Sequence, residues 1–242
     1  MQMKGFAGTN VYRMALKIAI ALLVLALAAA SAGCICCCGM DSLLSKMKKP
    51  VTAIALPQEL IIDDRSYSLL YSYDYLNRTA AKAGFKAFIP RIGYYPEEYG
   101  HSVDQMMDVG GVSEYKWFEY TDGSGRVSLG GFLAKAGSPL TVSYGHQSLV
   151  TMMHASMPTI NDPRLNDGGA QNVTHNGTAA IGDGADLYRF DADYNGSRSP
   201  CYFVIAKHSN MYVAVYSFES FEAAEAAAAE AVRWIDAAAA SP

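Results

Sequence analysis

An uncharged stretch of twenty-three residues, Ile18–Met40, lies near the start of a chain of 242 residues. About twenty apolar residues are enough to cross the hydrocarbon core of a membrane as a helix. Small residues end the apolar part of the stretch at Ala28–Gly33, and three basic residues precede it, Lys4, Arg13 and Lys17. A basic start, an apolar run and small residues before a cleavage site form the layout of a secretory signal. We therefore expect residues 1–33 to be a signal peptide or a membrane anchor.

The segment Ser31-Ala32-Gly33-Cys34 resembles the lipobox of prokaryotic lipoproteins. In that family the cysteine thiol receives a diacylglyceryl group and becomes the first residue after cleavage. Ser31 stands where the family usually places Leu or another aliphatic residue. The resemblance implies lipidation of Cys34, and two acyl chains hold a protein durably where one holds it only marginally. The alternatives are an uncleaved spanning helix over Ile18–Met40 and simple secretion.

All three alternatives place the rest of the chain outside the cytoplasm. We expect a cell-membrane protein, lipid-anchored or single-pass, in which residues 34–50 are a juxtamembrane linker and 51–242 a single extracytoplasmic domain. The net charge of −4, without a basic stripe, argues against a nucleic-acid partner. Four sequons for N-glycosylation agree with surface exposure, and they begin at Asn77, Asn172, Asn176 and Asn195.

Alternating apolar and polar residues joined by turns indicate strands in much of the domain. Tyr115–Thr121 and Arg126–Leu133 flank an Asp-Gly-Ser-Gly turn and predict a hairpin. Cys201–Lys207 and Met211–Ser217 predict a second hairpin that is covered on both faces. Apolar residues at helical spacing follow from Phe218. The sequence therefore predicts the α+β class, an antiparallel β-sheet flanked by helices, with an N-terminal signal or anchor segment.

The region between the two hairpins carries weaker signals. Leu140–Tyr144 indicates a short strand, and Gln147–Met157 indicates a helix that ends at Pro158. Thr159–Gly169 is expected to be a long polar loop. Two further strands are predicted between glycines, at Thr178–Ile181 and Ala185–Asp191.

The C-terminal pattern of a Tyr/Phe/Val-rich hairpin and a terminal helix resembles the Mog1/PsbP-like class of domains. The residues that carry this resemblance are Ser199-Pro200-Cys201-Tyr202-Phe203-Val204-Ile205, Met211-Tyr212-Val213-Ala214-Val215-Tyr216 and the helix from Phe218. The resemblance implies an antiparallel sheet sandwiched by helices. Members of this class are mostly accessory or binding proteins, so the resemblance names no activity.

Tyrosine is abundant, with sixteen residues. The members of one group all have odd residue numbers, so a regular strand would place their side chains on a single face of the sheet: Tyr67, Tyr71, Tyr73 and Tyr75. A second group follows in a Pro/Gly-rich segment: Tyr94, Tyr95 and Tyr99. Tyrosine combines a flat apolar ring with a polar tip, so both groups are a candidate contact surface for a protein or carbohydrate partner, with the second group as the possible ligand contacts. The alternative is that these rings only pack against the sheet.

No pattern predicts a metal or a cofactor. Four cysteines within five residues, at 34 and 36–38, cannot easily surround a tetrahedral ion. His146 and His154 are expected on one side of a helix, with their rings roughly 12 Å apart. The segment Gly182–Asp186 lacks the alternating oxygen ligands and closing glutamate of a calcium loop. We therefore expect no metal site and no cofactor.

Reaction signatures are missing from the sequence as well. No Gly-x-Ser-x-Gly elbow occurs, and no glycine-rich phosphate loop is followed by lysine. The sequence therefore favours a binding or accessory module over an enzyme, with Tyr67–Tyr99 and the loop Thr159–Gly169 as its contact surface. Two alternatives stay open. One is an envelope hydrolase with a site around His154, Asp162 or His175, and the other is a structural cell-surface protein.

Overall fold

The computed structural model of the protein describes residues 47–88, 104, 107–108, 110–162, 170–194 and 197–241. These residues belong to one compact unit that begins at Ser45. The predictions for residues 1–46, including the signal or anchor and the lipidation of Cys34, lie outside the described residues. None of the described helices is long and apolar enough to cross a membrane.

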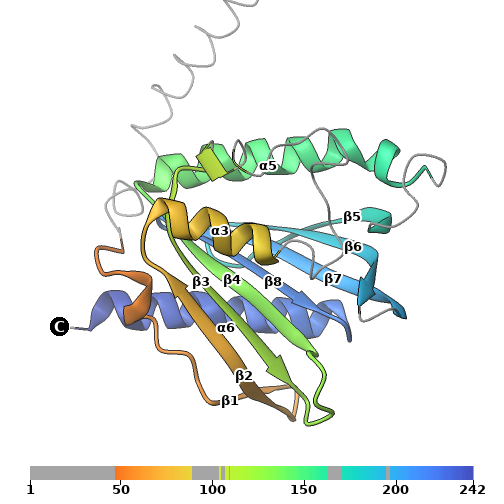
Figure 1. Ribbon diagram of the computed structural model, residues 1–242, viewed down its shortest axis with the longest axis horizontal. Helices are drawn as coiled ribbons and strands as arrows, with labels where there is room; N and C mark the ends of the chain where they lie inside the picture. The colour runs from red at the N-terminus through yellow and green to blue at the C-terminus, as the bar shows by residue number, and fades with distance from the viewer. Residues whose placement is uncertain are drawn as a thin grey trace, which may run out of the picture. The chain divides into compact units, whose positions relative to one another are not determined.

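Eight antiparallel strands form a single sheet with the order β1-β2-β3-β4-β8-β7-β6-β5 (Figure 1). Strands β1 to β4 form one meander and β5 to β8 form another, and the pairing of β4 with β8 joins the two. The strands are β1 Glu59–Ile62, β2 Arg65–Tyr75, β3 Val112–Thr121, β4 Leu129–Ala136, β5 Gln171–Ala179, β6 Ala185–Tyr194, β7 Ser197–His208 and β8 Met211–Ser217. The labelled helices are α3 Arg78–Phe88, α5 Pro139–Ile160 and α6 Phe221–Ala240, and a short 3₁₀ helix, η1, covers Val51–Ala53.

The expected α+β class is wrong, and the anchor segment that was part of this expectation lies outside the described residues. The described chain is built mainly from one continuous antiparallel sheet, whose strands contain more residues than the three helices together. Sequence patterns underestimated the sheet because β1 and β2 expose many polar side chains and lack long apolar runs. The sheet is therefore the frame that positions every other element.

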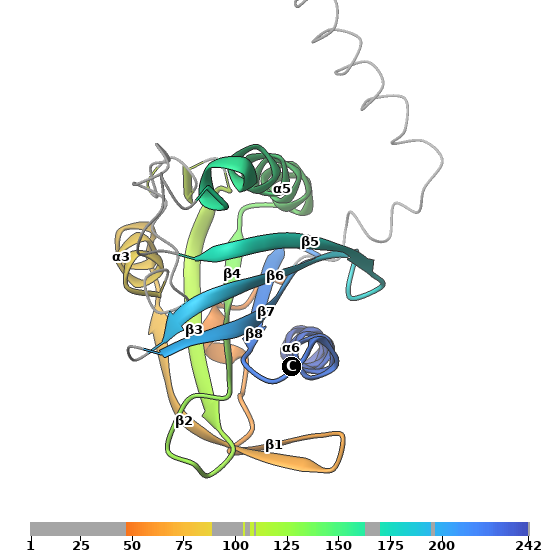
Figure 2. The ribbon, with the colours of Figure 1, turned by 90° about the vertical axis from the view of Figure 1, so that its right-hand side faces the viewer.

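The centre of the sheet is covered on both faces. Every residue of β4 and β8 is buried, as expected for strands in the middle of a two-faced core. Helix α6 packs on one face, while α3 and α5 pack on the other (Figure 2). The hairpin predicted from Cys201 to Ser217 is confirmed as β7 and β8, and the hairpin with the Asp-Gly-Ser-Gly turn is confirmed as β3 and β4.

Helix α6 forms as the alanine-rich sequence predicts, but it begins at Phe221 instead of Phe218. The side chain of Ser220 accepts a hydrogen bond of 3.2 Å from the backbone N–H of Ala223 and so caps the first turn. Phe218 lies outside the helix, and its ring packs against Tyr216 on the opposite face of the sheet. Small buried residues let α6 lie close to the strands: Ala223, Ala224, Ala227, Ala228, Ala231 and Ala238.

Helix α5 corrects two predictions. The strand expected at Leu140–Tyr144 is the first part of this helix, which runs on past Pro158 to Ile160. Proline suits the first position of a helix, which Pro139 occupies. Ser138 precedes it and caps the helix, because its Oγ accepts a hydrogen bond of 3.1 Å from the N–H of Thr141. Pro158 lies in the last turn, where its missing N–H costs one hydrogen bond and does not break the helix.

A β-bulge divides the tyrosines of β2 between the two faces of the sheet. Leu69 pairs with Tyr120 and Tyr71 pairs with Glu119, so Leu70 is the extra residue. Tyr67 therefore belongs to the core beneath α6, whereas Tyr71 packs into the core beneath α3 and α5. The expectation of a single tyrosine face is wrong, because one inserted residue reverses the parity of everything that follows.

Candidate functional site

Helix α5 brings a group of histidines onto the strands β5, β6 and β7. His146 and His154 lie two turns apart on the helix, and both reach the same side, as their spacing predicts. Asp186 and Tyr188 come from β6 and share one face of it, because they are two residues apart. His175, on β5, lies opposite Tyr188. Together these five residues are here called the histidine cluster.

Asp186 lies at the centre of the histidine cluster. Its Oδ1 is 3.0 Å from His175 Nε2, and its Oδ2 is 3.6 Å from His146 Nε2. His146 Nε2 is also 3.1 Å from the backbone oxygen of Ile205, the residue that faces Asp186 across the β6–β7 ladder. A carbonyl oxygen can only accept, so this nitrogen carries a proton and donates it to Ile205.

His154 and His175 meet at the outer edge of the cluster. Their ring centroids are 4.6 Å apart in an edge-to-face arrangement, and His154 Nε2 is 3.4 Å from the hydroxyl of Tyr188. His154 is exposed, and the exposed fraction of the side chains falls inward, to 27% for His175, 14% for Asp186 and 8% for His146. The histidine cluster therefore extends from the solvent-exposed His154 to the buried His146.

Burial governs the charge of the innermost histidine. Desolvation lowers the pKa of His146 below its usual value near 6.5, the Ile205 carbonyl and Asp186 act in the opposite direction, and Lys207 adds to the lowering. Burial also raises the pKa of Tyr188. At neutral pH His146 is therefore an uncharged hydrogen-bond donor, and Tyr188 keeps its hydroxyl proton.

An apolar cavity of about 60 Å³ lies on the other side of α5, between this helix, α3 and the sheet. The strands contribute Phe132, Ala134, Ile205 and Ala214, and the helices contribute Phe85, Leu149 and Met152. Ile205 connects the two features, because its side chain lines the cavity while its backbone oxygen meets His146. We call this space the α3–α5 cavity.

The polar groups at the α3–α5 cavity are mostly satisfied by other parts of the protein. The hydroxyl of Tyr212 donates to the backbone oxygen of Gly110 at 2.9 Å and lies 3.2 Å from that of Thr141. A Cβ atom at Gly145 would lie 2.0 Å from this hydroxyl, so glycine is what lets α5 approach the sheet here. The Tyr212 hydroxyl is therefore engaged by backbone oxygens, and the wall of the cavity is apolar.

The structure brings together only part of the sequence-predicted site. The hydrolase alternative names His154, Asp162 or His175. The structure brings His154 and His175 together, and the carboxylate that contacts His175 belongs to Asp186. Tyr94, Tyr95 and Tyr99 lie outside the described residues, as do Cys34, Asn195 and most of the predicted loop, residues 163–169. Within the described part of the chain, no three His, Cys, Asp or Glu residues are arranged to hold a metal ion.

Three sequon asparagines are described, and all three are exposed. Asn77 Oδ1 accepts from the N–H of Ala80 at 2.9 Å and caps α3. Asn172 has a positive φ of 54°, and its Nδ2 donates a hydrogen bond of 2.6 Å to Asp191 Oδ2. The Oδ1 of Asn176 accepts a hydrogen bond from Thr174 Oγ1. The predicted glycosylation of these residues stays a prediction.

Sequence reasoning missed Asp186 and Tyr188. Asp186 falls within the predicted strand Ala185–Asp191, but nothing in the sequence indicates that its carboxylate meets histidines of α5 and β5. The parity of Asp186, Tyr188 and Phe190 was the available signal, because it places a carboxylate on the same face as two buried aromatic rings.

Comparisons with known protein families, with curated protein sequences and with solved structures returned no match.

Proposed function

We propose that this protein is a membrane-anchored extracytoplasmic binding module that takes the apolar end of a small ligand into the α3–α5 cavity. The N-terminal signal-like segment supports the anchoring and the location. The single observation that carries the binding role is the cavity itself, with its almost wholly apolar wall. A wall of this composition favours an apolar guest.

The size of the cavity limits the ligand. An engineered apolar cavity of about 150 Å³ binds benzene or xenon, and the space here is about 60 Å³. It therefore fits a slim group, such as the end of an alkyl chain, rather than an aromatic ring. Met152 and Met107 line the wall, and flexible methionine side chains adapt to ligands of differing shape.

The test uses the full chain in lipid nanodiscs and a series of straight-chain carboxylates from butanoate to octanoate. A ligand that binds only the folded state raises its stability, so we expect the unfolding temperature to rise with ligand concentration. Ala214→Val should abolish this rise, because Ala214 lies between Phe132 and Ile205 on the cavity wall and the added methyl groups occupy the space.

Ala237→Val is the matched control, since it makes the same change on the exposed side of α6. This variant should respond to the carboxylates as the original chain does. An equal response in the Ala214→Val variant, or no response in the original chain, contradicts the proposal.

A second candidate function, hydrolysis, is favoured by the pair His175–Asp186. A carboxylate 3.0 Å from one ring nitrogen orients the imidazole and leaves its other nitrogen for proton transfer. This reading predicts turnover in a panel of ester, peptide and glycoside substrates that His175→Gln abolishes. His208→Gln is the control, because His208 forms a separate His–Asp pair with Asp236. If the original chain turns over none of these substrates, hydrolysis is excluded as its function.

A further inference from the structure

We infer that the start of α5 and the chain around Lys48 form a surface that contacts a membrane containing anionic lipids. This inference rests on the proposed membrane anchoring, and it adds how the folded domain meets the bilayer. It is carried by two exposed apolar side chains, by the place where the chain joins the domain, and by the charge at that place.

Leu140 and Tyr144 are the exposed apolar side chains. Tyr144 is 69% exposed, the highest fraction among the large hydrophobic residues of the described chain, and Leu140 is 65% exposed, equal to Ile61 of β1. A spacing of four places them on the same face of the helix. Tyrosine is enriched where membrane and water meet, because its ring is apolar and its hydroxyl is polar.

The chain that precedes the domain joins it at the same end of the sheet. The N–H of Met47 donates to Asn210 Oδ1 at 2.6 Å, and Asn210 Nδ2 donates to the backbone oxygen of Ala136 at 2.9 Å. Ala136 ends β4, and α5 begins three residues later at Pro139. The point where residues 1–46 connect and the first turn of α5 are thereby held to one end of β4.

A third apolar side chain lies at this end of the sheet. Leu76 is 54% exposed and directly follows Tyr75, the last residue of β2. Tyr75 pairs with Tyr115, near the end of β3 at which Val112 pairs with Ala136. Exposed apolar residues therefore gather where the preceding chain connects.

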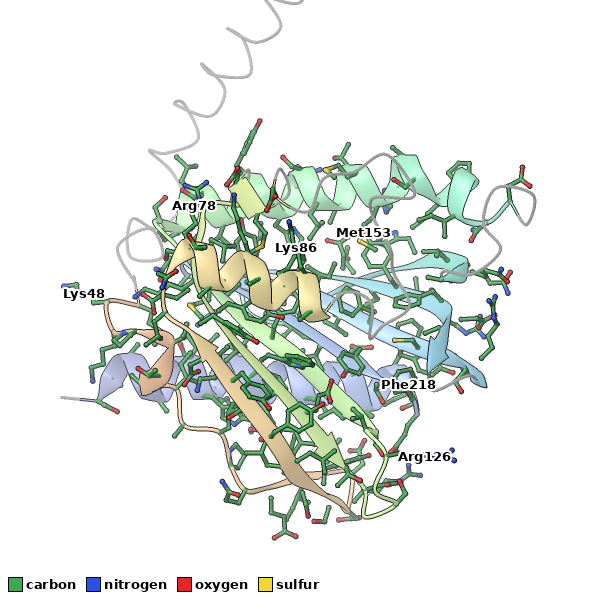
Figure 3. The ribbon with its side chains drawn as sticks, viewed as in Figure 1. Lys48, Arg78, Lys86, Arg126, Met153 and Phe218 are labelled. Carbon is green, nitrogen blue, oxygen red and sulfur yellow. The ribbon has the colours of Figure 1, made fainter. Side chains whose placement is uncertain are left out.

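Positive charge accompanies these apolar residues. Lys48 is exposed and carries this charge. The buried Lys135 is neutralised by Glu114 at 3.1 Å and holds the adjoining backbone, with Nζ 2.7 Å from the oxygen of Lys49 and 3.4 Å from that of Lys48. Figure 3 shows Lys48 at one side of the domain, away from Arg126 in the β3–β4 turn. Lysines beside a membrane anchor are attracted to anionic headgroups, so the occupant that fits this surface is an anionic bilayer.

The test places a photoreactive residue at the surface. The full chain with Tyr144→p-benzoylphenylalanine is reconstituted into vesicles of phosphatidylcholine with phosphatidylglycerol, recovered by flotation, irradiated and analysed by mass spectrometry. The control carries the same residue at Ser124, an exposed position in the β3–β4 turn at the opposite end of the ladder. We expect lipid adducts at position 144 to exceed those at 124 several-fold.

The outcomes separate the two proposals. A chain that floats with the vesicles but shows no excess of lipid adducts at 144 overturns the contact surface and leaves the anchor standing. Protein adducts in place of lipid adducts also overturn it, in favour of a second copy or a protein partner. A chain that does not float overturns the anchor and the surface together. Lys48→Gln should lower the yield at 144 in anionic vesicles and leave it unchanged in vesicles of phosphatidylcholine alone.

Discussion

His146 shows how burial decides the chemistry of a single residue. The sequence places His146 on a helix among apolar residues, but it does not reveal the hydrogen-bond and charge partners of its ring. In the structure its Nε2 meets the Ile205 oxygen at 3.1 Å and lies 3.6 Å from Asp186, in surroundings that favour the neutral ring. Its protonation should therefore be linked to the stability of the fold.

The first prediction concerns the pH dependence of unfolding. Because the pKa of His146 is lowered on folding, the unfolded chain binds more protons as the pH falls below about 6.5. The contribution of His146 to the free energy of unfolding should thus be fully present above this pH. It should be lost as the pH falls toward the lower pKa that His146 has in the folded state. His146→Gln should remove this part of the slope and cost about 1 kcal/mol at pH 7.5, because it disturbs the hydrogen bond to Ile205.

Urea unfolding of the full chain between pH 5 and pH 7.5 measures this effect. His208→Gln serves as control, since His208 pairs with the exposed Asp236 outside the histidine cluster. If the original chain and the His146→Gln variant lose stability in parallel as the pH falls, burial of His146 does not carry the effect.

Among the elements, α5 depends most on tertiary contacts. Gly145 lies in its interior, where glycine is unfavourable by about 1 kcal/mol relative to alanine. Its place is explained by the sheet, because a Cβ would lie 2.0 Å from the Tyr212 hydroxyl and 2.9 Å from the Cα of Gly110. Local propensity and packing therefore oppose each other at this position.

The second prediction is that packing against Tyr212, and not helix propensity, determines the stability effect of a substitution at Gly145. Gly145→Ala should destabilise the protein by about 1–3 kcal/mol, despite the better helix former, because α5 must move away from the sheet. Removing the obstructing hydroxyl with Tyr212→Phe should recover part of this loss. Thermal unfolding of the single and double variants provides the measurement.

Gly137→Ala is the matched control for Gly145→Ala. No atom outside its immediate neighbours lies within 4 Å of a Cβ built at Gly137, so this change should leave the stability nearly unaltered. Equal effects at Gly137 and Gly145 would show that backbone freedom, and not the approach of α5 to Tyr212, explains the glycine.

Elements whose signals are local could be predicted from the sequence. The β7–β8 hairpin, the β3–β4 hairpin and α6 carry their turns, caps and apolar faces within a few residues. The first part of α5 could not, because Leu140–Tyr144 also fits a strand. The bulge at Leu70 carries no signal of its own, yet it decides which face each tyrosine of β2 occupies.

The candidate site was less predictable than the elements. Its members come from α5, β5 and β6, and the sequence separates His154 from Asp186 by more than thirty residues. The sequence offers His154, Asp162 or His175 as alternative site residues and gives no sign that His154 and His175 lie together. Only the pairing of β5 with β6 beneath α5 makes them neighbours, so a long-range contact creates the site.

At the scale of the whole molecule, the sheet unites two meanders through the pairing of β4 with β8. This junction places the α3–α5 cavity and the histidine cluster beneath the same helix, with Ile205 shared between them. The proposed membrane contact uses the first turns of that helix. Binding, protonation and membrane contact would then all involve α5.

The intact mass of the protein recovered from its own cells shows whether the proposed binding domain is displayed on a membrane. We expect a membrane-extracted chain that starts at Cys34 and carries a diacylglyceryl group. A full-length chain that starts at Met1, lacks acyl groups and is found dissolved in the cytosol would contradict it.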